Sequence, residues 1–148
     1  MTVETVNPTV VPGPEPLSQS EERTWAMLAH LSVLVNLVTG VFGPWVALAI
    51  YVIYSKRSKY VAYHAMQSFL FQLLWWYGLG IVWAVTGLLS AVVIGVLLIP
   101  AACILTPVFL VGMAIAPVVG IIGAIRTSQG QDFKYWLVGD WVRGTLAD

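Results

Sequence analysis

The sequence predicts an all-α polytopic membrane protein with four transmembrane helices, a short hairpin and two long helices, followed by an interfacial amphipathic helix. Hydrophobic residues make up 59% of the 148 residues and charged residues only 9%, whereas a soluble domain carries roughly 25% charged residues. Charged side chains are also absent from Thr24 to Ser55 and from Tyr60 to Ile125. A helix needs about 20 apolar residues to cross a bilayer, so these stretches of 32 and 66 residues have room for four spans.

Residues 1–19 are predicted to form a disordered, proline-rich cytoplasmic tail, because four prolines lie between positions 8 and 16 among few residues that could be buried. A polyproline segment that binds a partner is the alternative. The tail lacks the basic and apolar regions of a secretory signal, so we expect the chain to be inserted without processing. Ser18 and Glu21 match a capping box, which predicts that the first helix begins here and runs to Thr39.

Gly43 and Pro44 are predicted to break this helix and to start the second one, which continues to Lys56. Each helix of about 13 to 17 residues reaches roughly 20 to 25 Å, which is short for a hydrocarbon core of about 30 Å. We therefore expect a tight hairpin that thins the bilayer or packs against longer helices. A re-entrant pair, which enters and leaves on one side, is the alternative.

The basic cluster at residues 56–59 is predicted to face the cytoplasm, because lysine and arginine near span ends are retained there. With four spans, both termini and all seven basic residues fall on that side. This predicts a multi-pass protein of a bacterial cytoplasmic membrane with both termini cytoplasmic. A five-span alternative, with a turn at residues 75–80, would place Arg126, Lys134 and Arg143 on the opposite side.

The third helix is predicted to begin near Ser58, with its first two turns at the interface, and to end before an apolar connector bracketed by Pro100 and Pro107. The fourth helix then runs from Pro107 to Thr127, and Pro117 should kink it. Residues 20–128 would thus form a four-helix transmembrane domain.

Residues 129–148 are predicted to form an interfacial amphipathic segment and tail. Phe133, Trp136, Leu137 and Trp141 follow helical spacing, with charged residues elsewhere. We expect this helix to anchor at the membrane surface, and a docking surface for a partner is the alternative.

Small residues predict helix-packing faces, because lipid provides no hydrophobic drive for helix association and small side chains let backbones approach. Such residues recur along both long helices: Gly80, Ala84, Gly87, Ala91 and Gly95 in one, and Gly112, Ala116, Gly120 and Ala124 in the other.

Polar side chains within the apolar helices are costly unless they find one another. We expect interhelical polar contacts among six of them: His30, Asn36, His64, Gln67, Ser68 and Gln72. His30 and His64 lie at similar depth, so haem or metal ligation is a weak alternative, because no third ligand lies in the spans.

The sequence predicts neither a catalytic site nor a cofactor. The spans contain no carboxylate for acid–base work and no phosphate-binding loop. Zero formal net charge argues against nucleic-acid binding, and the single cysteine, Cys103, cannot form a disulfide within the chain. We therefore expect a protein that is not an enzyme.

Residues 58–68, with the sequence Tyr63-His64-Ala65-Met66-Gln67, resemble the membrane family related to the twenty-kilodalton subunit of the chloroplast inner-envelope import translocon. Residues 27–32 and 40–44 are also similar to that family, and the resemblance covers residues 22–143. It implies a four-helix membrane domain with cytoplasmic termini and no assigned activity. The chain departs from the family pattern at Tyr135-Trp136, where the family tends to have proline, and in a longer region from Gly80 to Pro107.

These observations favour a non-enzymatic structural or accessory subunit of a larger membrane assembly, whose partners are membrane lipids, other membrane-protein subunits or a second copy. The translocon resemblance suggests a component of a protein-translocation apparatus as the alternative. That role would require a polar cavity, lined by His30, Asn36, His64, Gln67 and Gln72. A haem-binding electron carrier is a third, weaker possibility.

Overall fold

The computed structural model describes residues 14–146, and every regular element in that part of the chain is helical, which confirms the all-α fold class. Residues 1–13 of the predicted disordered tail lie outside the described residues. The elements are α1 (Gln19–Leu31), a 3-10 turn η1 (Ser32–Leu34), α2 (Val35–Thr39), α3 (Gly43–Tyr54), α4 (Lys59–Gln72), a π-helical turn η2 (Leu73–Tyr77), α5 (Gly78–Ser90), α6 (Ile94–Ser128) and α7 (Gly139–Leu146).

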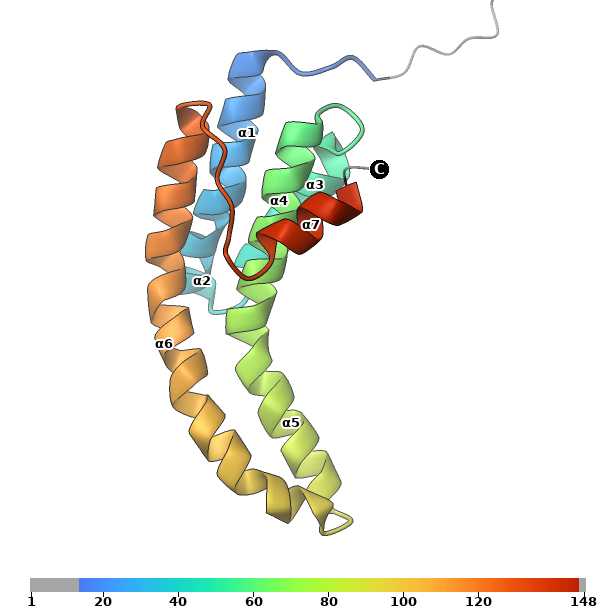
Figure 1. The fold of residues 1–148 in the computed structure, drawn as a ribbon, viewed down its shortest axis with the longest axis vertical. Coiled ribbons are helices and arrows are strands. Elements are labelled where there is room, and N and C mark those ends of the chain that lie inside the picture. The colour runs from blue at the N-terminus through green and yellow to red at the C-terminus, as the bar shows by residue number, and fades with distance from the viewer. Residues whose placement is uncertain (1–13, 147–148) are drawn as a thin grey trace, which may run out of the picture.

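The long helices form a curved antiparallel hairpin that determines the shape of the molecule (Figure 1). One arm is the continuous helix α4–η2–α5, and the other is α6. Helices α1 to α3 pack against only one half of this hairpin, where α7 also crosses α4 (Figure 1). One half of the molecule is therefore a four-helix bundle, and the other half consists of α5 and the first part of α6.

Two of these helices are long and apolar enough to cross a membrane: residues 59–90 and residues 94–128. At 1.5 Å per residue they measure about 48 and 52 Å. Helix α3 is apolar but shorter. The described residues thus contain two candidate spans. The four spans expected from the sequence remain a prediction.

The predicted start of the first helix is confirmed. The Glu21 amide donates to Ser18 Oγ at 3.3 Å, and the Ser18 amide donates to Glu21 Oε2 at 2.8 Å, which completes a capping box. The hydrogen bonds from Ser18 hold the pKa of Glu21 below its ordinary value. The helix then reaches Thr39 through the 3-10 turn η1. Just before the cap, Leu17 is buried against the bundle, so this end of the predicted tail is packed.

The five-span alternative is wrong, because it needs a turn at residues 75–80. These residues lie inside the continuous helix from Lys59 to Ser90, where the backbone widens into the π-helical turn η2 and stays hydrogen-bonded. A π turn accommodates an extra residue without leaving the helix. In an apolar setting this costs less than an irregular turn with unpaired backbone groups.

The predicted connector between Pro100 and Pro107 is also wrong, as is a fourth helix starting at Pro107. The chain turns earlier, at residues 91–93, and α6 runs unbroken through both prolines and Pro117. Each proline removes one helical hydrogen bond, whereas an irregular connector in lipid would leave several groups unpaired. Val93, in the turn, has a φ of 69°, which is unusual for a β-branched residue.

The predicted amphipathic helix at the C-terminal end is displaced. Helix α7 begins only at Gly139, and residues 131–135 are not helical. Phe133 packs against the buried cluster whereas Trp136 is 71% exposed, so the four predicted residues do not share one face. Helical spacing failed here because alternate residues, Phe133 and Tyr135, pack inward from an extended segment.

The small residues of the two long helices differ in their surroundings. The four on α6 (Gly112, Ala116, Gly120, Ala124) are all buried. By contrast, Gly80, Ala84 and Gly87 on α5 and Ala91 in the following turn are exposed, and a Cβ at Gly80 or Gly87 would meet no atom within 4 Å. Gly95, at the start of α6, is buried. The close approaches of α5 and α6 occur at Gly95, where a Cβ would overlap the backbone of Thr86 and Ser90, and at Gly78, where a Cβ would overlap the Phe109 ring.

Gly120→Leu should destabilise the bundle by about 1 to 3 kcal/mol, because overpacking forces neighbouring atoms apart. A Cβ at Gly120 would lie 2.5 Å from Val33 Cγ1 and 3.0 Å from the His30 carbonyl oxygen. Thermal unfolding in detergent measures the change. Val118→Leu, at an exposed position of the same helix, is the matched control. Equal melting temperatures for the two variants would contradict the packing argument.

Candidate functional site

A buried polar network joins α1, α2, α4 and the segment before α7. All six polar residues singled out in the sequence belong to it, and none is more than 3% exposed. Helix α4 contributes four of them at successive turns, facing the two from α1 and α2: His64, Gln67, Ser68 and Gln72 face His30 and Asn36.

The first part of the network is centred on two histidines. His30 Nε2 lies 3.2 Å from His64 Nδ1, and His30 Nδ1 lies 3.0 Å from the Tyr135 hydroxyl. His30 and His64 are both fully buried. The His30 ring thus bridges α4 to the C-terminal segment.

Gln67 fastens that segment to α4. Its Nε2 donates to the Phe133 carbonyl at 2.8 Å and contacts His64 Nδ1 at 3.0 Å, while its Oε1 accepts from the Tyr135 amide at 3.1 Å. The Tyr135 ring also stacks on Phe71, with centroids 4.2 Å apart. One glutamine therefore pairs with the backbone on both sides of residue 134 and holds the extended chain in place.

One arrangement of protons satisfies these contacts with both rings neutral. Burial raises the pKa of Tyr135 above its ordinary value, so its hydroxyl keeps a proton and donates to His30 Nδ1. His30 Nε2–H and Gln67 Nε2–H then share the single lone pair of His64 Nδ1. His64 Nε2 carries the remaining hydrogen and lies 3.9 Å from Asp132 Oδ1, which is beyond hydrogen-bond length.

The second part of the network is centred on Gln72. Its Nε2 donates to Ser32 Oγ at 2.8 Å and to Ser68 Oγ at 3.0 Å, and its Oε1 accepts from Asn36 Nδ2 at 3.1 Å. Both serine hydroxyls donate to the Ala29 carbonyl oxygen at 2.7 Å. These bonds tie α4 to α1, η1 and α2.

Gly43 and Pro44, the predicted helix break, lie at the start of α3. The Gly43 amide donates to Asn36 Oδ1 at 2.7 Å. A Cβ at Gly43 would lie 2.5 Å from both Asn36 Nδ2 and Gln72 Oε1, so only glycine fits against the network here. The position therefore links the turn of the short hairpin to the second part of the network.

Tyr135 is the member of the network that sequence reasoning missed. The signal for it was the alternation of Phe133 and Tyr135, which is the spacing of an extended segment with one buried face. Helical spacing over the same residues obscured this pattern. A buried tyrosine also needs a hydrogen-bond partner for its hydroxyl, and His30 provides it.

The geometry does not suit haem ligation by His30 and His64. Their nitrogens lie 3.2 Å apart in a direct contact, and both side chains are fully enclosed, which leaves no space for a porphyrin between them. Among residues 14–146 there is also no group of three His, Cys, Asp or Glu side chains arranged to hold a metal ion.

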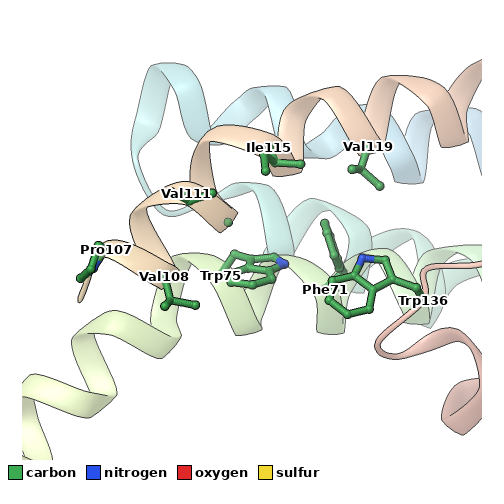
Figure 2. A pocket seen from close by; sticks show the side chains of 9 residues that line it. Phe71, Trp75, Pro107, Val108, Val111, Ile115, Val119 and Trp136 are labelled. Carbon is green, nitrogen blue, oxygen red and sulfur yellow. The ribbon is translucent and has the colours of Figure 1, made fainter. Parts of the chain in front are cut away.

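An apolar groove lies apart from the network. This groove of about 440 Å³ runs between α4–η2 and α6 and is bounded at one end by Trp136 (Figure 2). Aromatic and aliphatic side chains line it, together with one glycine: Phe71, Trp75, Pro107, Val108, Val111, Gly112, Ile115, Val119 and Trp136. The polar residues expected to line a conducting cavity are instead buried in helix contacts.

Residues 21–142 match the MamF/MmsF family, described as the magnetosome magnetite crystal formation protein family. The chain belongs to this family. The match begins in the first turn of α1, continues through α6 to the first residues of α7, and includes every member of the polar network. No curated protein and no solved structure matches the chain.

The MamF/MmsF match corrects the resemblance to the import-translocon family, which is wrong. The shared motif was short, a histidine and a glutamine three residues apart at the start of a long helix. In this MamF/MmsF protein His64 and Gln67 serve to bond α4 to its neighbours. With the resemblance withdrawn and no polar cavity formed by the network, the translocation role loses both of its supports.

Tyr135→Phe should lower the free energy of unfolding by about 1 to 3 kcal/mol, because it leaves the buried His30 Nδ1 without its donor. The ring still stacks on Phe71, so the effect isolates the hydroxyl. Thermal unfolding in detergent measures it. Tyr51→Phe, at a half-buried tyrosine outside the network, is the matched control. Equal losses in the two variants would contradict the role assigned to the Tyr135 hydroxyl.

Proposed function

We propose that this chain is a non-enzymatic structural subunit of the magnetosome membrane and that it acts in magnetite crystal formation from within the bilayer. The observation that carries the proposal is the MamF/MmsF match over residues 21–142. The two long apolar helices support an integral membrane protein. The network supports a structural role, because its polar groups bond to one another and to the backbone.

In this proposal the bundle end of the molecule faces the cytoplasm, together with both termini. The reason is the distribution of charge. All seven basic residues of the chain lie before α4, at its first residue or after Ile125, and none lies between Tyr60 and Ile125. Basic residues near span ends are retained on the cytoplasmic side.

The opposite end of the long hairpin would then face the magnetosome lumen. Residues 88–97, around this turn, carry no charged side chain. Iron binding by a protein surface uses carboxylate, imidazole or thiolate ligands, and this stretch contains none of them. We therefore assign the chain an indirect part in crystal formation, through the membrane or through another subunit, in place of direct contact with the mineral.

The exposed small residues of α5 support an assembly with further subunits or a second copy. Gly80, Ala84 and Gly87 follow the spacing of one helix face, Ala91 follows directly after the helix, and all four are exposed in the single chain. Small residues in membrane helices allow the close backbone approach on which helix association depends. Lipids and membrane-protein neighbours are thus the partners assigned to this chain.

Deleting the gene in the bacterium that produces the chain should change the size or number of magnetite crystals, as counted by electron microscopy. A tagged copy should restore them and copurify with the crystal-bearing membrane fraction. Cys103→Ser, at an exposed position of α6, should restore them equally and serves as the matched control. Unchanged crystals after deletion, with the tagged chain confined to other membranes, would overturn the proposal.

A further inference from the structure

We infer that the short hairpin α1–α3 enters only the cytoplasmic leaflet, and that the chain is a wedge that favours membrane curved convex toward the cytoplasm. The wedge shape comes from the structure alone. The direction of curvature rests on the orientation given in the proposed function.

The tip of the short hairpin reaches only part of the way along the long one. The Tyr77 hydroxyl donates to the Val41 carbonyl at 2.8 Å and accepts from Trp45 Nε1 at 2.8 Å, so the tip lies level with Tyr77. Tyr77 follows Lys59 by 18 residues, and Ser90 follows Tyr77 by 13. At 1.5 Å per residue the short hairpin ends about 20 Å before the end of the long one.

The C-terminal segment locates the boundary of the hydrocarbon layer on the bundle side. It is not helical before Gly139, it carries exposed Asp132 and Lys134, and its Tyr135 stacks on Phe71. Irregular backbone exposed to lipid does not occur in the hydrocarbon region. The segment therefore lies in the headgroup layer, and the hydrocarbon begins near the level of Phe71.

The distance from this boundary to the end of the long hairpin fits one bilayer. Ser90 follows Phe71 by 19 residues, which is about 29 Å of helix, against a hydrocarbon thickness of about 30 Å. Tyr77 lies only about 9 Å beyond Phe71 on the same scale. The tip of the short hairpin thus ends within the first leaflet.

The tip is built to end in lipid. Its side chains are apolar and exposed, with Val38 at 90% and Phe42 at 58%. Three of the four amides from Gly40 to Gly43 are paired within the protein: Gly40 donates to the Asn36 carbonyl, Phe42 to Thr39 Oγ1 and Gly43 to Asn36 Oδ1. A turn in contact with water would not need this pairing, whereas a turn inside the hydrocarbon does.

The two leaflets therefore accommodate different amounts of protein. Four helices and α7 occupy the cytoplasmic side, whereas only α5 and the first part of α6 occupy the other (Figure 1). Exposed Trp136 and Trp141 add interfacial anchors on the wider side. Extra area in one leaflet is relieved when the membrane bends with that leaflet outermost, which is the curvature of a vesicle that faces the cytoplasm.

Cysteine accessibility tests the depth of the short hairpin. In a Cys103→Ser background, we would introduce single cysteines at exposed positions, Val41→Cys at the short tip and Val92→Cys at the long tip, with Lys56→Cys as the cytoplasmic control. A membrane-impermeant maleimide should label Val41→Cys from neither side of sealed vesicles and only after detergent is added. Val92→Cys should be labelled from the side opposite to Lys56→Cys. Labelling of Val41→Cys from either side of intact vesicles would overturn the inference.

Membrane tubes pulled from vesicles that contain the full, fluorescently tagged chain test the wedge. With the bundle end outermost, the density on the tube should exceed that on the parent vesicle. With the opposite orientation the chain should be depleted from the tube, so each orientation is the control for the other. Equal densities in both orientations would overturn the wedge. Neither assay uses crystals, so the wedge and the role in crystal formation can fail independently.

Discussion

Every backbone N–H and C=O that lies in lipid must find its partner inside the protein, and this constraint accounts for most of the unusual geometry of the chain. It explains why α6 continues through three prolines and why the long arm passes through a π-helical turn without bending back. It also explains the turn of the short hairpin, where Asn36 and Thr39 pair with the amides of Gly43 and Phe42. In each case the chain loses one regular helical hydrogen bond, and several backbone N–H and C=O groups that would otherwise be unpaired keep their partners.

In this protein, hydrogen bonds between polar side chains specify how the helices pack, whereas in a water-soluble core the burial of apolar surface drives packing. Lipid tails are as apolar as leucine, so burying leucine gains little in a bilayer, whereas a bonded glutamine specifies its partner. Helix α4 shows this most clearly at Gln72, just inside the hydrocarbon boundary, which bonds to Ser32 of η1 and to Asn36 of α2. The glycines allow the helices to approach closely enough for these bonds. At Gly123, for example, a Cβ would lie 2.9 Å from His30 Nδ1.

The sequence allowed the helical class, the cap at Ser18 and the inventory of polar residues to be predicted, because charge, capping chemistry and apolar runs are local properties. The start of α6 and the path of residues 129–138 could not be predicted. Proline normally signals a break, and Tyr135 is held in its extended segment by residues distant in the chain: His30, Gln67 and Phe71. The family assignment failed for a related reason: a histidine and a glutamine one turn apart describe a bonding face that many helix bundles need.

The position of Tyr135 has a consequence for biosynthesis. Helices α1 to α6 are made first and can insert in order, but His30 and Gln67 lack their donor and backbone partners until residue 135 has left the ribosome. During that interval the polar groups of His30 and Gln67 are exposed on the surface of the nascent bundle, where membrane chaperones and quality-control proteases can recognise them. Docking of residues 131–135 covers these groups. Folding of the protein is therefore completed by a non-helical segment, after all of the long helices are in place.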